Sequence, residues 1–411
     1  MTKTTKGEDH QDPQLEQDAQ RPAESQLEEP LHPGWQTLAQ VFQSSDQFFE
    51  RFLYLLGYDY SSNVYVITGD YLTVVDPGND YTMFMDLFRR GFKPTEVKKI
   101  VLTHGHRDHA MGAFEFIRSY PSIIQTGGFE LILHQESPQV MKKAITDFGC
   151  RFTEVKGGEI LELSGLDWEV IYTPGHTIDG ITLYHAPSKT AITGDTVLPH
   201  AMAEADQNAG GRLDHYLFGV KSLLKKDIAN VLPGHGIPVA GLGNQVVEQT
   251  YESLMLTVIG VKDQIPWVDG AAKLVQKGLL EEAVFCCDKE LSRQPENMTA
   301  LQLKAFCLID LNRCQESLEL LDKILAQQPD NAHALTGKGQ ALLGEGKYDD
   351  SIEYFDRALQ INPNLKEAQI FKGMALYLAG RYDEAMDIEA FSSEFISRFK
   401  EELATKVQPP K

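Results

Sequence analysis

The stretch Thr103-His104-Gly105-His106-Arg107-Asp108-His109 places three histidines and one aspartate within six residues. It comes directly after a predicted buried strand, residues 99–102, and before a predicted amphipathic helix, residues 110–119. Neutral imidazole and carboxylate groups are ligand types for zinc, iron and manganese. Four such side chains in one strand-to-helix turn predict a metal centre.

Three later segments each present one more ligand-type side chain, beside glycine and at the end of a predicted strand. They are Thr173-Pro174-Gly175-His176-Thr177, Thr193-Gly194-Asp195-Thr196 and Leu232-Pro233-Gly234-His235-Gly236. A single histidine in a glycine-rich turn is more often structural. Together, in this order after the first cluster, the segments predict that His176, Asp195 and His235 join the same centre.

Short apolar runs alternate with amphipathic stretches from about residue 48 to residue 239, which predicts a layered domain of helices and strands. The predicted strands are residues 51–56, 63–68, 71–75, 99–102, 131–134, 161–163, 169–172, 182–184 and 191–193, and a further strand ends at Val231. The predicted helices are residues 81–90, 110–119 and 244–261.

Residues 265–400 have an almost wholly helical pattern with a period of 34 residues, which separates Pro295, Pro329 and Pro363. Small residues recur with the same period at Ala271, Ala305, Gly339 and Gly373, and at Ala283, Ser317, Ser351 and Ala385. The pattern resembles about three and a half tetratricopeptide repeats, in which small residues let paired helices approach and the proline ends the second helix.

From about residue 48 to residue 262, the chain resembles the metallo-β-lactamase superfamily. The resemblance rests on Ser61-Ser62-Asn63-Val64-Tyr65, on Asp76-Pro77-Gly78 and on the metal motifs in family order. It implies an α+β fold, a four-layer αββα sandwich, followed here by an all-α repeat solenoid. By the same resemblance, His104, His106 and His176 hold one metal ion, Asp108, His109 and His235 hold a second, Asp195 bridges both, and Asp76 supports the site.

The ligand set implies two divalent metal ions, with zinc expected and iron or manganese as alternatives. Two such ions share a water, lower its pKa and yield a bridging hydroxide that attacks a carbonyl or phosphoryl centre. Asp108 is the candidate catalytic residue, because it would orient this hydroxide or accept its proton. The motif lacks the glutamate of flavodiiron oxygen reductases, which disfavours oxygen reduction, whereas single-iron persulfide dioxygenases share most of it and remain an alternative.

The stretch from Val197 to Leu224 is the predicted substrate rim, with His200, Arg212, His215 and Tyr216 as candidates for substrate contact. The predicted domain bounds are a disordered acidic tail at 1–34, a catalytic domain at 35–264, a repeat domain at 265–400 and a second tail at 401–411.

Charge and composition narrow the function classes. The 411-residue chain has 38 basic and 59 acidic residues and a net charge of −21, and no long segment is basic, which disfavours binding to a phosphate backbone. No apolar run approaches the ~18 residues of a membrane span, and the polar start of the chain shows no signal core. Five cysteines without CxxC spacing favour free thiols in a reducing compartment. We therefore expect a cytoplasmic protein that binds neither membranes nor nucleic acid.

Three hypotheses follow from these patterns. The first is a binuclear hydrolase of a small ester or thioester, with repeats that serve protein interaction or homo-oligomerisation. The second is a metal-dependent endoribonuclease of the same fold, which the acidic charge disfavours. The third is a repeat scaffold whose lactamase-like domain only binds a ligand, and the complete set of seven ligand-type residues argues against it.

Overall fold

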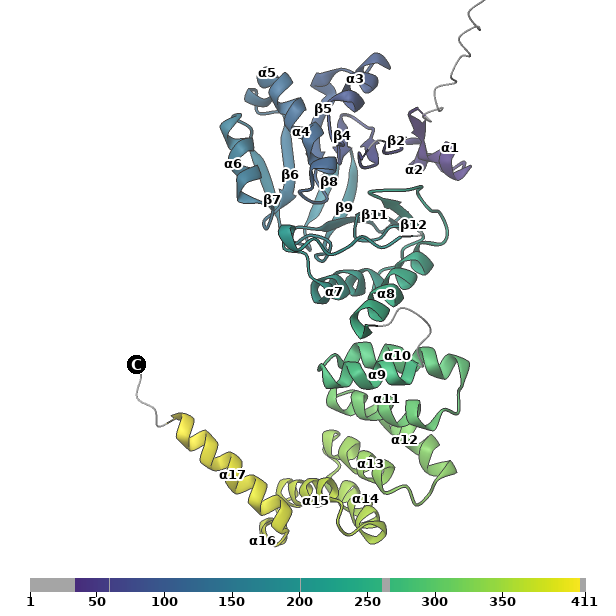
Figure 1. The fold of residues 1–411 in the computed structure, drawn as a ribbon, viewed down its shortest axis with the longest axis vertical. Coiled ribbons are helices and arrows are strands. Elements are labelled where there is room, and N and C mark those ends of the chain that lie inside the picture. The colour runs from purple at the N-terminus through teal and green to yellow at the C-terminus, as the bar shows by residue number, and fades with distance from the viewer. Residues whose placement is uncertain (1–33, 59, 200, 261–266, 407–411) are drawn as a thin grey trace, which may run out of the picture. The chain divides into compact units, whose positions relative to one another are not determined.

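The computed structural model describes residues 34–58, 60–199, 201–260 and 267–406 (Figure 1). The chain divides into two compact units, Met1–Val247 and Glu248–Lys411. The division falls within helix α8 (Gly243–Ile259). Of the two predicted tails, only residue 34 and residues 401–406 lie within the described residues.

The first unit contains two sheets, with strand orders β1-β2-β3-β4-β5-β6-β7 and β12-β11-β10-β9-β8. The larger sheet consists of β1 (Gln36–Thr37), β2 (Phe52–Leu55), β3 (Val64–Ile67), β4 (Leu72–Val75), β5 (Val97–Val101), β6 (Glu130–His134) and β7 (Phe152–Val155). The smaller sheet consists of β8 (Ile160–Leu163), β9 (Leu166–Tyr172), β10 (Ile181–His185), β11 (Thr190–Gly194) and β12 (Asn230–Pro233). The helices before α8 are α1 (Leu38–Phe42), α2 (Gln47–Glu50), α3 (Thr82–Arg89), α4 (Arg107–Ser119), α5 (Pro121–Gln125), α6 (Gln139–Asp147) and α7 (Leu213–Leu224).

Alternating side chains of the larger sheet build the layers, because neighbouring residues of a strand point to opposite faces. On β3, Val66 packs in a buried cluster with Phe116 of α4, whereas Ile67 packs in a second cluster with Trp168 of β9. The first cluster lies between helices and the larger sheet, and the second lies between the two sheets. Helix α7 packs against β9 on the remaining face (Figure 1). The predicted four-layer αββα sandwich is confirmed.

Strand directions bring the ligand-bearing segments to one edge. β9 and β11 both pair antiparallel with β10 and so run in the same direction, and β12 pairs in parallel with β11. The residues that follow these strands, His176, Asp195 and His235, therefore lie at the same edge of the smaller sheet. The segment after β5 joins them there, since the backbone N–H of Ile181 donates to the carbonyl oxygen of Thr103 at 2.8 Å.

Several elements of the first unit were not predicted, including β1, α1, α2, α5, α6 and β7. On α6, Lys142 is buried, and its ammonium lies 2.6 Å from Glu154 Oε1 on β7. A lysine on the inner face of the helix and a carboxylate on the strand interrupt the apolar pattern on which the prediction depended. The other predicted strands and helices are present, with ends that differ by a few residues.

The second unit consists of helix pairs that follow the 34-residue period. They are α9 (Trp267–Gln276) with α10 (Leu280–Arg293), α11 (Met298–Asp310) with α12 (Cys314–Gln327), α13 (Ala332–Gly344) with α14 (Tyr348–Ile361) and α15 (Lys366–Leu378) with α16 (Tyr382–Met386), before α17 (Glu389–Lys406). The periodic small residues are buried at helix contacts: a methyl group on Gly339 would lie 2.6 Å from the Phe355 ring. The predicted repeat architecture is confirmed.

An ion pair recurs between successive repeats, joining the second helix of one to the first helix of the next. This Lys–Asp ladder consists of Lys304 with Asp288, Lys338 with Asp322 and Lys372 with Asp356. The lysine side chains are largely shielded, whereas the aspartates are more exposed. None of the helices in the described residues is long and apolar enough to cross a membrane.

Asparagine caps two of the repeat helices. Asn331 Oδ1 accepts a hydrogen bond from the backbone N–H of Ala334 at 3.0 Å, at the start of α13. We expect Asn331→Ala to lower the free energy of unfolding by about 1 kcal/mol, because an orphan N–H at the helix start loses its partner. Urea denaturation followed by circular dichroism would measure the change. Asn364→Ala, at an exposed asparagine just before α15, is the control, and an equal loss in both variants would contradict a capping role.

Candidate metal centre

Three imidazoles converge at the shared edge of the sheets. His104 and His106 lie in the turn between β5 and α4, and His176 follows β9. His106 Nδ1 lies 3.2 Å from His104 Nε2 and 3.0 Å from His176 Nε2. The three nitrogens are close enough to one another to bind a single metal ion.

A second group lies beside the first. Asp108 and His109 occupy the first turn of α4, and Asp108 Oδ2 lies 3.0 Å from His235 Nε2 and 3.6 Å from His109 Nε2. Asp195 lies between the groups, with Oδ2 at 3.6 Å from both His176 Nε2 and His235 Nε2. The structure thus brings together all seven predicted ligand residues, with Asp195 between the two groups.

The outer nitrogens of two imidazoles donate to oxygen atoms. His176 Nδ1 donates to the carbonyl oxygen of Glu204 at 2.6 Å, and His106 Nε2 donates to Asp206 Oδ2 at 3.1 Å. Since a carbonyl and a carboxylate have no proton to give, the inner nitrogens of both rings carry lone pairs. Two lone pairs 3.0 Å apart repel each other unless a cation or a proton lies between them. The arrangement therefore suits a bound cation.

Asp76 and Thr103 orient the two buried imidazoles of the centre, those of His104 and His109. Asp76 Oδ2 accepts hydrogen bonds from His109 Nδ1 at 2.9 Å and from Thr103 Oγ1 at 2.6 Å. Because the Thr103 hydroxyl gives its proton to Asp76, it accepts the Nδ1 proton of His104, which lies 3.2 Å away. In their neutral forms both rings therefore present Nε2 to the centre as an acceptor, in the way that supporting carboxylates orient metal-binding histidines.

Two buried polar atoms of the centre, His109 Nε2 and Asp195 Oδ1, have no hydrogen-bond partner among the described residues, although they lie 3.4 Å apart. Burial lowers the pKa of His109, but Asp195 and Asp76 raise it well above its ordinary value, so this position favours positive charge. Burial raises the pKa of Asp195, but the surrounding imidazoles, His109 foremost, bring it below its ordinary range, so the group is a carboxylate. The orphaned atoms and the local demand for positive charge both fit a divalent cation.

Two segments of the chain match models of known protein families. Residues 57–235 match the family model of the metallo-beta-lactamase superfamily, and residues 308–366 match that of the tetratricopeptide repeat. A probable metallo-hydrolase of Methanocaldococcus jannaschii is 31% identical over 202 residues, which are 45% of this chain and 92% of that protein. The chain belongs to the metallo-beta-lactamase superfamily. The family fold implies divalent metal ions, for which the His and Asp groups described above are the candidate sites.

Other relatives are more distant. A lactamase-like protein, notP, of an Aspergillus species is 24% identical over 199 residues, covering 47% of this chain and 54% of that protein. An atrochrysone carboxyl ACP thioesterase of a Cryptosporiopsis species is 21% identical over 225 residues, covering 53% of this chain and 63% of that enzyme. The chain thus spans between about half and two thirds of these two relatives. A solved metallo-beta-lactamase family protein of Thermus thermophilus is 20% identical, with a TM-score of 0.41, and the match covers 54% of this chain and 86% of that one.

The turn that carries His235 is held by the opening strands of the metallo-beta-lactamase domain. Asn63 Nδ2 donates to the carbonyl oxygens of Pro233 at 2.9 Å and Gly236 at 2.7 Å, and the Tyr65 hydroxyl donates to the Pro233 carbonyl at 2.7 Å. The backbone N–H of Asn63 also donates to Gly234 at 2.6 Å. The motif around Asn63 therefore positions the turn of a candidate ligand, His235, that lies about 170 residues away in the sequence.

The four residues predicted to contact substrate differ in their exposure. His200 lies outside the described residues. Arg212 is exposed and forms a two-point ion pair with Asp214, and His215 is half-buried. Tyr216 does not lie at the rim: it is 1% exposed, and its hydroxyl lies within 3.1 Å of the carbonyl oxygens of Asp195 and Thr196. Its side chain therefore positions the segment that carries Asp195, and we remove it from the candidate substrate contacts.

Two site residues were missed from the sequence, Glu204 and Asp206, which hold the outer nitrogens of His176 and His106. Glu204 acts through its backbone carbonyl, for which a sequence offers no signal. Asp206 lies in a polar segment that contains other acidic residues, and its hydrogen bond to the backbone N–H of Asn208 is typical of an ordinary turn.

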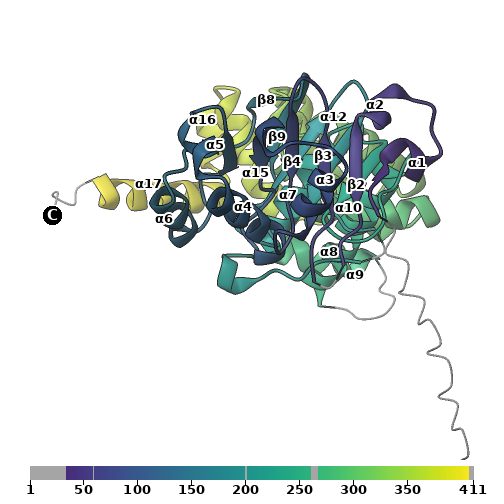
Figure 2. The same cartoon turned by 90° about the horizontal axis from the view of Figure 1, so that it is seen from above.

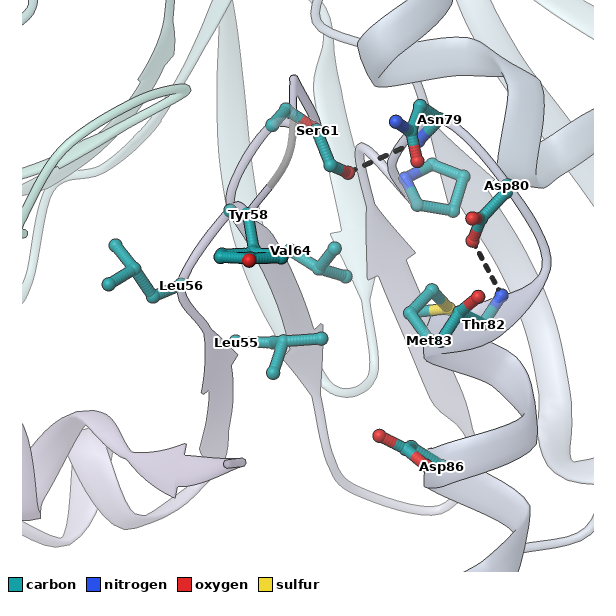
Figure 3. Close-up of a pocket in the computed structure, with 13 residues that line it drawn as sticks. Leu55, Leu56, Tyr58, Ser61, Val64, Asn79, Asp80, Thr82, Met83 and Asp86 are labelled. Atoms are coloured by element: carbon teal, nitrogen blue, oxygen red, sulfur yellow. Dashed lines mark hydrogen bonds between the residues drawn. The ribbon is translucent and has the colours of Figure 1, made fainter. Parts of the chain in front are cut away.

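A pocket opens directly on the second ligand group, and we call it the centre pocket. It is lined by Tyr60, Asn79, Arg107, Asp108, Met111 and His235. A neighbouring pocket shares Asn79 with it and extends towards Ser61, Asp80 and Asp86 (Figure 3). There, Ser61 Oγ accepts a hydrogen bond from the backbone N–H of Asn79 at 3.2 Å. Carboxylates and hydroxyls make this second pocket suitable for polar groups.

Proposed function

We propose that the metallo-beta-lactamase domain is a binuclear metal-dependent hydrolase that cleaves a small ester or thioester. The observation that carries the proposal is the convergence of the imidazole nitrogens and carboxylates around Asp195, a donor set that suits two divalent cations. His104, His106 and His176 would hold one metal ion, Asp108, His109 and His235 the other, and Asp195 both. Zinc suits these nitrogen and oxygen ligands, and iron or manganese are alternatives.

When bound, two divalent cations supply a water of lowered pKa and stabilise negative charge on the oxygen of a substrate carbonyl. Asp108 is the residue of this chain best placed to handle a proton. Its contacts with His109 and His235 both use Oδ2, so Oδ1 remains to accept a hydrogen bond from water or substrate. Burial raises the pKa of Asp108, but His235 and His109 bring it below its ordinary value, which keeps the group a carboxylate.

The ester or thioester class is supported by the names of two relatives. Relatives named as thioesterases, from a Cryptosporiopsis species and from Aspergillus aculeatus, are 21% and 22% identical to the chain. For the repeats we propose protein interaction, either with a peptide of another protein or with a second copy of the chain. We keep 35–264 and 265–400 as the functional domain bounds.

The metal content tests the binuclear assignment. We expect about two metal ions per chain by elemental analysis and hydrolysis within a panel of esters, thioesters and lactones, with single-stranded RNA left uncut. His235→Ala should lose one ion more readily than the other, because only the second group uses this imidazole. His333→Ala, at an exposed histidine of α13, is the matched control. Full activity with one ion per chain would support the single-iron dioxygenase alternative instead, and metal-dependent RNA cleavage would support the endoribonuclease.

A further inference from the structure

An apolar groove runs between α4 and α6, which lie next to each other in the first unit (Figure 2). We call it the α4–α6 groove. Its volume is about 460 Å³, and its lining is mostly carbon: Gly105, Arg107, Ala110, Met111, Phe114, Glu115, Arg118, Pro138, Val140, Met141, Ala144 and Phe148. Val140 is 78% exposed and Phe148 43% exposed, so large apolar side chains at its rim are left in water. Exposed apolar surface around a cavity commonly marks a binding site.

The groove adjoins the centre pocket. Arg107 and Met111, one turn apart on α4, line both cavities. At its inner end the groove reaches Gly105, between two of the proposed metal ligands. From Arg107 to Arg118 it follows α4 for about 16 Å, at ~1.5 Å per helical residue. A ligand with its reacting carbonyl at the metal centre would pass Arg107 and Met111 to extend an unbranched chain along this path.

We propose that the α4–α6 groove binds the apolar acyl chain of the substrate, and this inference rests on the proposed function. The two cavities beside the centre differ in character: the carboxylates of Asp80 and Asp86 interrupt the apolar lining of the pocket of Figure 3, whereas the surface of the α4–α6 groove is mostly carbon. An ester or thioester with one apolar half would place that half in the groove. Methionine side chains at Met111 and Met141 adapt to chains of different shape.

Chain-length dependence on the full-length, metal-loaded protein tests the inference. With p-nitrophenyl acetate, butyrate and octanoate, we expect kcat/KM to rise at least tenfold from acetate to octanoate. Burial of each methylene is worth about fourfold at most, from ~0.8 kcal/mol per group. Ala144→Glu places a charge in the half-buried wall of the groove and should abolish this rise, while the value for acetate stays within twofold. Thr146→Glu adds the same charge to an exposed position of α6 outside the groove and should change neither value.

Calorimetric titration with octanoate provides a readout independent of turnover. The parent and Thr146→Glu should bind octanoate equally, and Ala144→Glu at least tenfold more weakly. Val140→Glu, at a rim position that tolerates charge, should give a smaller loss and serves if Ala144→Glu does not fold. Ester hydrolysis without chain-length preference, and with unchanged octanoate binding in Ala144→Glu, would overturn the groove assignment but leave the hydrolase intact. If no ester is hydrolysed at all, the proposed function is wrong. The titration would then still show whether the groove binds an apolar chain.

Light scattering separates a ligand from a second copy of the chain as the occupant. The parent and Ala144→Glu should have the same oligomeric state. If Ala144→Glu alone converts an oligomer to a monomer, the α4–α6 groove is a contact between copies, and the acyl-chain assignment is wrong.

Discussion

Asp195→Ala is expected to abolish hydrolysis and to remove both metal ions. The variant should lose about 10³-fold or more in kcat/KM, because the electrostatic stabilisation that metal ions provide in such centres is of at least that size. Asp195 Oδ2 lies equally far from His176 and His235, and Oδ1 is the closest carboxylate oxygen to the otherwise unpartnered His109 Nε2. Removing it leaves the inner nitrogens of His106 and His176 facing each other without a nearby carboxylate. Asp108 is then the carboxylate that remains beside His109 and His235. Elemental analysis and the ester panel measure both effects.

Asp227→Ala is the matched control, because this exposed aspartate forms an ion pair with Lys189 at 2.6 Å, away from the centre. It should keep two metal ions and the turnover of the parent. Retention of both ions by Asp195→Ala, at the occupancy of the control, would show that the bridging role is wrong even if turnover fell.

Gly234→Ala is expected to reduce turnover by about 10²-fold through one methyl group. A Cβ at Gly234 would lie 2.2 Å from Asp195 Oδ1 and 2.7 Å from His109 Cε1, so at least one of these residues must move. The backbone of Gly234 is not in the left-handed region, so alanine meets no conformational penalty there. The effect therefore reports displacement of the centre, and displacements near 1 Å can cost this much in rate. Metal content and kcat would be measured together.

Gly236→Ala, two residues further on, provides the opposite case. Its φ is +83°, which costs an alanine about 1 kcal/mol of stability, but a Cβ there would meet no described atom within 4 Å. It should lower the melting temperature slightly and leave the metals in place. If Gly234→Ala and Gly236→Ala had equal activity, the close packing behind Asp195 would not constrain the centre.

The convergence of the seven candidate ligands could be predicted because each segment that carries them follows a strand and contains glycine, in an order that the family shares. His176, Asp195 and His235 needed no long-range information, since parallel strand ends meet at one edge once the layered fold is recognised. Asp206 could not be found in this way. Its contact with His106 joins positions 100 residues apart through a loop whose path no local pattern determines.

Tyr216 shows a signal that was present in the sequence but given too little weight. Together with Leu217, Val220 and Leu223 it forms the apolar stripe of α7, and all four are buried. The 3.6-residue period places it on the inner face of the helix. Its position beside Asp214 and His215 instead suggested a polar rim. The helical period therefore predicted the burial of Tyr216, whereas the polar character of its neighbours did not.

The Lys–Asp ladder also marks where the solenoid begins and ends. One period before Lys304 the chain has Gly270, and one period after Asp356 it has Ala390. Neither outermost position therefore offers a charged group to an additional unit. An internal duplication would find complementary charges at both of its junctions, whereas an extension at either terminus would find none. The charge pattern of the repeats therefore disfavours additional repeats at either end of the array, independently of any partner that the repeats bind.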